Sequence, residues 1–276
     1  MNHPIFPCLW FNQNAEEAAN YYESVFPEFK WISKNPFAYN FELLGHRMMA
    51  LNAGPEYSIN SSISFFVNLE EEAIIKEIWD NMLAQGGKAL MELNEYPWSP
   101  YYGWCQDKFG VNWQFMKEHE SSAKIVPNLS FTQQNAGKAK EAMEFYCSIF
   151  PNSKPLFADT YNKGEHDVEG YYKYSQTLIN GQPFCAMDSS MPGHEFVFNE
   201  GVSFVVVVDT QEEIDFFWEK LTEGGKEGRC GWLTDRYGVS WQVTPSQLGA
   251  LMNNPETAPK TAYNFMQMNK IIIQDL

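Results

Sequence analysis

The amino-acid sequence predicts an α+β fold built from tandem βαβββ modules, with two copies of the same module in one chain. Three observations predict this fold. Local patterns recur in one order about 120 to 140 residues apart, strand-like and helix-like spacings alternate within each copy, and a glycine pair follows a helical pattern in both copies. We place the first module at residues 1–120 and the second, with a C-terminal helical tail, at 121–276.

The repeat is visible in matched segments that keep their order along the chain. The clearest pairs are FPCLWF (6–11) with VPNLSF (126–131), MMALN (48–52) with FCAMD (184–188), NSSISFFV (60–67) with NEGVSFVV (199–206), and GWCQDKFGVNWQF (103–115) with GWLTDRYGVSWQV (231–243). Chance matches would not keep one order, so we interpret the chain as an internal duplication.

Within one copy, strand and helix patterns follow each other. Pro7, Leu9 and Phe11 keep a two-residue spacing, which is typical of a half-buried strand. Residues 75–82 place apolar side chains on one helical face, and Gly86 then supplies the left-handed stop that ends the helix. The predicted order is a strand, a helix, three strands, a second helix and closing strands.

Composition excludes several classes of function. The chain has 19 Lys and Arg against 35 Asp and Glu, and a net charge of −16 repels phosphate backbones and anionic lipid. No apolar run reaches the roughly 18 residues of a membrane span. Five scattered cysteines without a Cys-x-x-Cys motif indicate reduced thiols. We therefore expect a cytoplasmic protein with no nucleic-acid or membrane partner.

The two copies of the first strand differ on one face only. Its apolar alternate positions match, whereas Cys8 and Trp10 of the first copy are replaced by Asn128 and Ser130 in the second. Because successive strand residues point to opposite faces, the matched face is predicted to pack under helices. The differing face is predicted to border a site that changed separately in each half.

The last strand of each copy divides in the same way. Trp113 and Trp241 fall on the apolar face and are interpreted as core residues. Gln114 and Gln242 fall on the opposite face. Either these amides hydrogen-bond a neighbouring strand or water, or they contact a ligand, and the sequence leaves both interpretations open.

Several of these motifs resemble a known superfamily. The segments PCLWF, NAEEAANYYESVFP, LINGQPFCAMD and CGWLTDRYGVSWQV are similar to those of the vicinal oxygen chelate superfamily, which includes glyoxalases, bleomycin resistance proteins and dioxygenases. They most resemble its PhnB-like branch, often labelled 3-demethylubiquinone-9 3-methyltransferase. The resemblance implies paired βαβββ modules whose curved mixed sheets form a cleft with helices on the outside. It also implies a small substrate or drug in that cleft, commonly with a divalent metal.

The metal ligands of the superfamily do not carry over to this sequence. Its metalloenzymes use a His in a first strand, a His or Glu in the middle strands and a Glu in a last strand. The first strands here offer Cys8 and Asn128, Ser62 precedes the middle strand, and the last strands carry Gln114 and Gln242. Neutral amides attract a divalent cation much less than carboxylates do. We expect no cofactor and assign no metal ligand, although a divalent metal stays conceivable.

Three hypotheses of function follow. The first is a metal-free protein that binds a small, partly aromatic molecule beside Cys8, Trp10 and Phe66. The alternative is a metal-dependent lyase, isomerase or dioxygenase with a rebuilt site around Asp188, Asn128 and Gln242. The third treats one module as a scaffold for the other, an intrachain pseudo-dimer that leaves a homodimer open. The candidate ligand-binding residues are Cys8, Trp10, Asn52, Ser62, Phe66, Gln114, Asn128, Ser130, Asp188 and Gln242.

Neither catalysis nor a catalytic residue is assigned from the sequence. The methyltransferase label gains no support, because no strand is followed by a glycine-rich loop that opens a helix and could hold a nucleotide-like cofactor.

Overall fold

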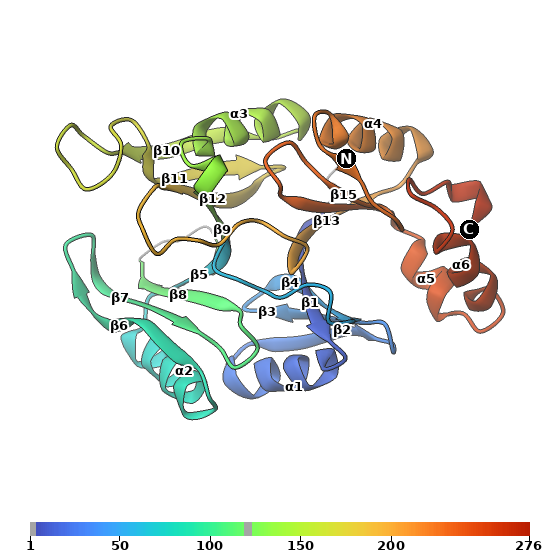
Figure 1. Ribbon diagram of the computed structural model, residues 1–276. Coiled ribbons are helices and arrows are strands. Elements are labelled where there is room, and N and C mark those ends of the chain that lie inside the picture. The colour runs from blue at the N-terminus through green and yellow to red at the C-terminus, as the bar shows by residue number, and fades with distance from the viewer. Residues whose placement is uncertain (1–3, 119–122) are drawn as a thin grey trace.

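The computed structural model describes residues 4–118 and 123–276, which form four consecutive βαβββ units (Figure 1). The first unit contains β1 (Ile5–Asn12), α1 (Ala15–Val25), β2 (Phe29–Lys34), β3 (Ala38–Leu43) and β4 (His46–Ala53). The second contains β5 (Ile63–Leu69), α2 (Glu72–Ala84), β6 (Lys88–Tyr96), β7 (Ser99–Gln106) and β8 (Asn112–Lys117). The third contains β9 (Ile125–Thr132), the 3-10 turn η1 (Gln133–Asn135), α3 (Ala139–Ile149), β10 (Lys154–Thr160), β11 (Tyr172–Ile179) and β12 (Gln182–Ser189). The fourth contains β13 (Val202–Val208), α4 (Gln211–Thr222), β14 (Lys226–Glu227), β15 (Trp232–Thr234) and β16 (Ser240–Pro245).

The predicted α+β fold with tandem βαβββ modules is confirmed, and each sequence repeat holds two such units rather than one. The expected boundary between residues 120 and 121 falls in 119–122, outside the described residues, so the exact boundary stays a prediction.

Each sheet combines strands from both repeats. Sheet A has the order β14-β15-β16-β13-β1-β4-β3-β2, and sheet B has the order β10-β11-β12-β9-β5-β8-β7-β6. The joints between repeats are the antiparallel pairs of β1 with β13 and of β5 with β9. Each eight-stranded sheet is therefore completed by the other repeat, and the chain is an intrachain pseudo-dimer.

The alternating pattern of the strands separates a helix-covered face from an open face. Leu9 and Phe11 of β1 belong to the main core, whereas Phe6 and Cys8 form a separate small cluster with Val205 on the other face. Helices α1 and α2 lie on one side of the molecule, and α3 and α4 lie on the opposite side (Figure 1). The differing face of the first strand is thus the face away from the main core, which we call the open face. That this face borders a ligand site stays a prediction.

A buried aspartate joins the two units of the first repeat. Asp107, in the turn between β7 and β8, is 4% exposed. Its Oδ2 accepts hydrogen bonds from the Tyr22 hydroxyl of α1 (2.9 Å) and from Trp113 Nε1 (3.0 Å). Its Oδ1 accepts the backbone N–H groups of Phe109 and Val111. Burial raises the pKa of Asp107, and the hydrogen bonds from Trp113 and Tyr22 oppose that rise.

The second repeat contains an equivalent buried aspartate. Asp235 is 3% exposed and accepts hydrogen bonds from the Tyr146 hydroxyl (2.6 Å) and from Trp241 Nε1 (2.9 Å). Its Oδ1 accepts the backbone N–H groups of Tyr237 and Val239. The two closely matched sequence motifs are therefore structural, because each supplies an acceptor that fastens a helix of one unit to the last strands of the next.

We predict that Asp107→Asn lowers the free energy of unfolding by about 2–4 kcal/mol, because an amide NH₂ would face donors inside the core. Urea denaturation followed by circular dichroism measures the loss. Tyr22→Phe removes one donor without adding another and should cost about 1 kcal/mol. A loss for Asp107→Asn no larger than that for Tyr22→Phe would contradict this account.

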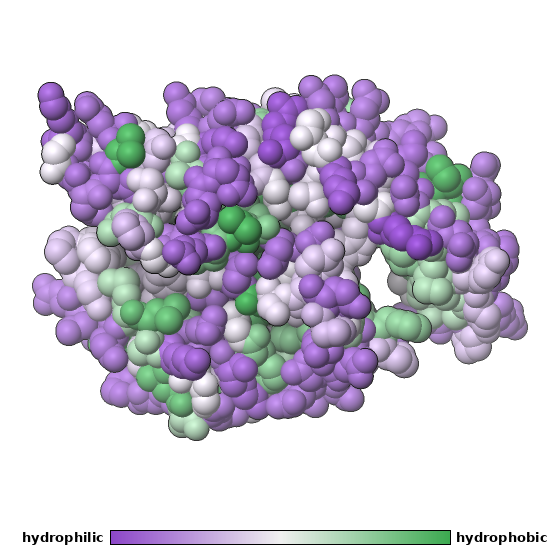
Figure 2. All heavy atoms as spheres, viewed as in Figure 1, coloured by the Kyte–Doolittle hydropathy of each residue, from purple (hydrophilic) through white to green (hydrophobic). Residues whose placement is uncertain are grey.

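The tail beyond the fourth unit contains α5 (Leu248–Asn253), α6 (Ala258–Phe265) and the short turn η2 (Ile273–Asp275). It binds the edge of sheet A through the N–H groups of Cys230 and Gly231, which donate to the carbonyls of Met268 and Asn269 (both 2.7 Å). The space-filling view shows an opening between this segment and the main body (Figure 2). In residues 4–118 and 123–276, no helix is long and apolar enough to cross a membrane.

Because each sheet takes strands from both repeats, the structure predicts how the first repeat behaves by itself. Residues 1–118 would expose the pairing edges of β1 and β5, which β13 and β9 cover in the full chain. We expect this fragment to form a homodimer that rebuilds both sheets, and size-exclusion chromatography with light scattering measures its mass. A stable monomer would contradict the requirement for pairing between repeats.

Candidate functional site

The open face of sheet B carries a connected group of neutral polar side chains. Gln114 Nε2 donates to Ser64 Oγ (2.7 Å), and Asn128 Nδ2 donates to the same oxygen (3.2 Å) and to Ser130 Oγ (3.1 Å). The Tyr102 hydroxyl donates to Gln114 Oε1 (2.6 Å). These side chains come from β5, β7, β8 and β9, so both repeats contribute to one site.

Sheet A carries the equivalent group on its open face. Gln242 Nε2 donates to Ser203 Oγ (3.0 Å), and Cys8 hydrogen-bonds with both side chains. The matched positions are thus Asn128, Ser64 and Gln114 in sheet B, and Cys8, Ser203 and Gln242 in sheet A. We refer to these two sets of three residues as the sheet B triad and the sheet A triad.

The triads explain the two glutamines that the sequence left open. Gln114 and Gln242 each bond a serine of the neighbouring strand. Both amides are nearly buried, with exposures of 4% and 6%. The interpretation that they bond a neighbouring strand is therefore correct for the side-chain N–H group of each.

The chemistry of the triads does not suit the divalent metal that the family resemblance implies. Burial raises the pKa of Cys8 to about 12, opposed by hydrogen bonds from Gln242 and Ser203, so the thiol is protonated near neutral pH. A hydroxyl and an amide complete each set, and metal binding requires deprotonated ligands. Across residues 4–118 and 123–276, no three His, Cys, Asp or Glu side chains gather in a way that could hold a metal ion.

Aromatic side chains surround the sheet B triad. Phe66 meets Tyr174 edge-on with ring centroids 5.7 Å apart, and Tyr102 meets both Tyr96 (5.7 Å) and Trp98 (5.9 Å). Three methionines pack against this cluster: Met91, Met116 and Met187. Trp98 is 61% exposed at the turn between β6 and β7. This face thus combines aromatic and methionine side chains with neutral polar side chains.

The sheet A triad has different neighbours. Trp10 packs edge-on against Tyr57 (5.0 Å) and Trp232 (5.7 Å), and its Nε1 donates to the Gly54 carbonyl (2.8 Å). The rest of the face near Cys8 is aliphatic and contains Val205, Met49, Leu51 and Val207. The two faces have therefore diverged in chemistry, although their triads occupy matched positions.

Two buried polar atoms on these faces have no hydrogen-bond partner among the described residues. They are Asn128 Oδ1 in sheet B and Ser240 Oγ in sheet A. Asn128 is fully buried, and Ser240 is 1% exposed. An unpaired buried acceptor costs about 1–3 kcal/mol, which a ligand donor would recover.

Asp188 and Asn52 lie on the helix-covered face and are separated from the triads. Asp188 Oδ1 accepts the N–H groups of Gly137 (2.8 Å) and Ala139 (3.0 Å) at the start of α3. Asn52 Oδ1 accepts the N–H of Ala15 at the start of α1 (3.4 Å). Strand alternation explains this placement, because each lies two residues after a core alanine. Both side chains position the first helix of their repeat.

Ser62 also lies outside the triad. It precedes β5, and its carbonyl accepts the N–H of Ser130 (2.8 Å), which joins β5 to β9. The side chain at the centre of the sheet B triad is Ser64, two residues later, and its equivalent is Ser203. The sequence contained a signal for both, since a serine recurs within ISFF and VSFV. Sequence reasoning missed it because matched residues were assigned to the core.

Tyr102 and Tyr174 were also missed from the sequence. Tyr174 comes from β11, and its hydroxyl contacts Gln176 Nε2 (2.9 Å) and Cys185 Sγ (3.2 Å). Nothing in the local sequence distinguishes these tyrosines from core aromatics. Of the ten predicted residues, the structure places Phe66, Gln114, Asn128 and Ser130 together on sheet B, and Cys8, Trp10 and Gln242 together on sheet A.

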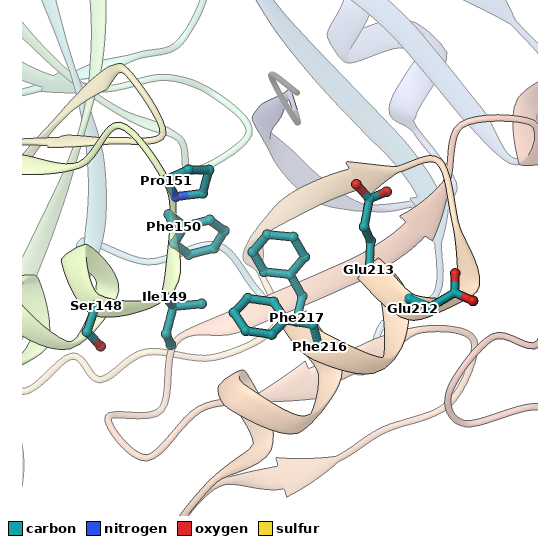
Figure 3. Close-up of a pocket in the computed structure, with 8 residues that line it drawn as sticks. All are labelled: Ser148, Ile149, Phe150, Pro151, Glu212, Glu213, Phe216 and Phe217. Atoms are coloured by element: carbon teal, nitrogen blue, oxygen red, sulfur yellow. The ribbon is translucent and has the colours of Figure 1, made fainter.

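A separate hollow of about 450 Å³ lies outside both sheets, between the end of α3 and the start of α4 (Figure 3). Phe150 and Phe217 stack there with ring centroids 5.2 Å apart. Glu213 accepts the N–H groups of Asp209 and Thr210 and completes the cap of α4. This hollow is a junction between two helices, and none of its lining residues belongs to a triad.

Solved structures with this architecture include glyoxalase I from Zea mays. That structure is 10% identical, and the match covers 87% of this chain and 92% of that chain with a TM-score of 0.60. The "Putative 3-demethylubiquinone-9 3-methyltransferase, PhnB protein" from Bacillus cereus is 36% identical. That match covers 45% of this chain and 100% of that chain, with a TM-score of 0.42. Comparison with curated proteins found no match.

The chain thus has a glyoxalase-like fold. More narrowly, the model of the 3-demethylubiquinone-9 3-methyltransferase family matches residues 3–116 and 123–244. The chain belongs to this PhnB-like family, as the sequence motifs indicated.

We predict that Cys8 and Cys185 resist iodoacetamide at pH 8 in the native protein. Burial raises the pKa of both thiols to about 12, so about 10⁻⁴ of each is ionised at that pH. Mass spectrometry of the alkylated protein measures the labelling. The partly exposed Cys147 and Cys230 provide the internal comparison and should react first. Rapid labelling of native Cys8 would contradict its placement.

Proposed function

We propose that this protein binds a small, uncharged, ring-containing molecule on the open face of sheet B, without a divalent metal. The observation that carries the proposal is the unpaired Oδ1 of Asn128, a fully buried acceptor beneath an aromatic wall. A ligand that donates one hydrogen bond to this oxygen and stacks on the surrounding rings would satisfy both features.

The aromatic wall sets the shape of this ligand. Tyr102 and Tyr174 lie on opposite sides of the triad, and each contacts further rings, Tyr96 and Trp98 on one side and Phe66 on the other. Planar rings match such walls, because aromatic pairs prefer offset or edge-on contacts with centroids about 4.5–7 Å apart. The neutral triad favours an uncharged ligand, since no charged partner belongs to it.

The structure does not favour the alternative of a metalloenzyme with a rebuilt site, because Asp188 lies away from the triads. That hypothesis relied on Asp188, whose two carboxylate oxygens accept three backbone N–H groups on the helix-covered face. The family description names a methyltransferase. However, the geometry of the two triads gives none of their side chains a role in methyl transfer. The proposal therefore favours binding over catalysis.

All five cysteines are unpaired, which supports the expectation of a reducing, cytoplasmic environment.

Binding of 2-naphthol and 2-methoxynaphthalene, measured by isothermal titration calorimetry, tests the proposal. We expect 2-naphthol to bind about tenfold more tightly, because its hydroxyl can donate to Asn128 Oδ1 and the methyl ether cannot. Asn128→Ala should remove the difference between the two probes. The control Asn253→Ala, at an exposed position in α5, should preserve it.

Equal affinity of the wild-type protein for the two naphthalenes would contradict the role of Asn128. Stoichiometric binding of Zn²⁺ or Ni²⁺ in the same calorimeter would contradict the metal-free site.

A further inference from the structure

The open face of sheet A borders an enclosed opening. In Figure 1, α4 lies outside the arm of the sheet that contains β13 and β15, and α1 lies outside the arm that contains β2, β3 and β4. The opening in the space-filling view lies between these two arms and the tail (Figure 2). Because the helices cover the outer surfaces of both arms, the open face of the sheet points into this opening. We call it the sheet A passage.

The C-terminal tail closes the sheet A passage on the side opposite to the sheet. It hydrogen-bonds the β15 end of the sheet through Cys230 and Gly231. At the other end, Asn35 Nδ2 in the turn between β2 and β3 donates to Asn253 Oδ1 of α5 (3.4 Å). The tail therefore bridges the two ends of sheet A, which makes the passage a place where a small molecule would contact protein on more than one side.

Two paired strands set the length of the passage wall. On β1, the open-face side chains begin with Phe6 and end with Trp10. On β4 they begin with Arg47, continue with Met49 and end with Leu51. Four residues of a strand span about 13 Å, so Arg47 and Leu51 mark two separate ends of the wall.

Arg47 supplies a positive charge at one end. Its guanidinium carbon lies 3.8 Å from the centroid of the Phe6 ring, and its Nη2 donates to Asn40 Oδ1 (3.2 Å). Glu42 is close enough to interact with Arg47 electrostatically, but its carboxylate pairs with Lys30 (3.4 Å). Arg47 is exposed. A guanidinium carries five N–H donors in a planar fork, so a carboxylate can bind Arg47 while the Asn40 contact persists.

The other end is aromatic and lies near an acidic side chain. Trp10 packs edge-on against Tyr57 and Trp232. The Glu200 carboxylate raises the pKa of the Tyr57 hydroxyl, which shows that a negative charge lies close to this end. An anion in the passage would therefore be oriented with its charge at Arg47 and its body toward Trp10.

The wall between the two ends is apolar and partly accessible. Met49, Leu51 and Val207 are half-buried and pack against the buried cluster around Cys8. An apolar wall with one cationic end suits an anion that carries a hydrocarbon body. The matched residue of Arg47 in the second repeat is Pro183, so the open face of sheet B has no equivalent cation at this position.

We propose that the sheet A passage binds an aliphatic carboxylate, with its carboxylate at Arg47 and its chain along Met49 and Leu51. The ligand class differs from the uncharged ring compound proposed for sheet B, and the two sites are independent of each other.

Octanoate is the probe, and 1-octanol is its uncharged counterpart of equal chain length. We expect octanoate to bind the full-length protein saturably and at least tenfold more tightly than 1-octanol by isothermal titration calorimetry. Arg47→Gln should weaken octanoate binding about tenfold, and Arg47→Lys should weaken it less because the charge remains. Lys140→Gln removes one positive charge from an exposed ion pair with Glu144 and should leave the affinity unchanged. Asn128→Ala, which alters sheet B, should also leave it unchanged.

A local signal identifies the site in the unaltered protein. With methyl-labelled methionine, the nuclear magnetic resonance signal of Met49, assigned from Met49→Leu, should shift on addition of octanoate, and the signals of Met91 and Met187 on sheet B should not. Equal affinity for octanoate and 1-octanol, an Arg47→Gln variant with wild-type affinity, or an unmoved Met49 signal would each overturn the proposal. Circular dichroism confirms that the variants are folded, and the naphthalene titrations report separately on the sheet B triad.

Discussion

The pairing of β1 with β13 and of β5 with β9 is the constraint on which the rest of the structure depends. These two antiparallel joints connect residues about 200 and about 60 positions apart in the chain and close both eight-stranded sheets. Each open face is therefore built by both repeats. The sheet B triad takes Ser64 and Gln114 from the first repeat and Asn128 from the second, so neither repeat can assemble a triad by itself.

The two buried aspartates make a second kind of connection, between the units of one repeat. The joints connect the two repeats within a sheet, whereas Asp107 and Asp235 connect the two units of a repeat through a helix tyrosine and a strand tryptophan. Each carboxylate accepts four hydrogen bonds, which offset the cost of burying it. Together the two kinds of contact join the four units into one scaffold, and the main hydrophobic core takes residues from all four.

Duplication left the scaffold nearly unchanged and the open faces different. The helix-covered faces match because close packing tolerates few changes in volume. The open faces diverged: one became aromatic and rich in methionine, and the other became mostly aliphatic around Cys8.

The sequence by itself determined the α+β class, the duplication, the family and the two faces of the first and last strands of each repeat. Period-two spacing and matched segments are local properties, and they correctly assigned Cys8, Trp10, Gln114 and Asn128 to open faces. Sequence reasoning failed where the outcome depended on neighbours in space. Asp188 could not be recognised as a helix cap, because its partners at the start of α3 lie about 50 positions before it.

Tertiary structure alone decided which strands share a sheet. The same four units could pair within a repeat or between repeats, and local periodicity is identical in both cases. The observed pairing of strands between the repeats brings Ser64 beside Asn128 and Ser203 beside Cys8. Long-range strand pairing leaves no local mark on the sequence, so the composition of both sites emerged only from the folded chain.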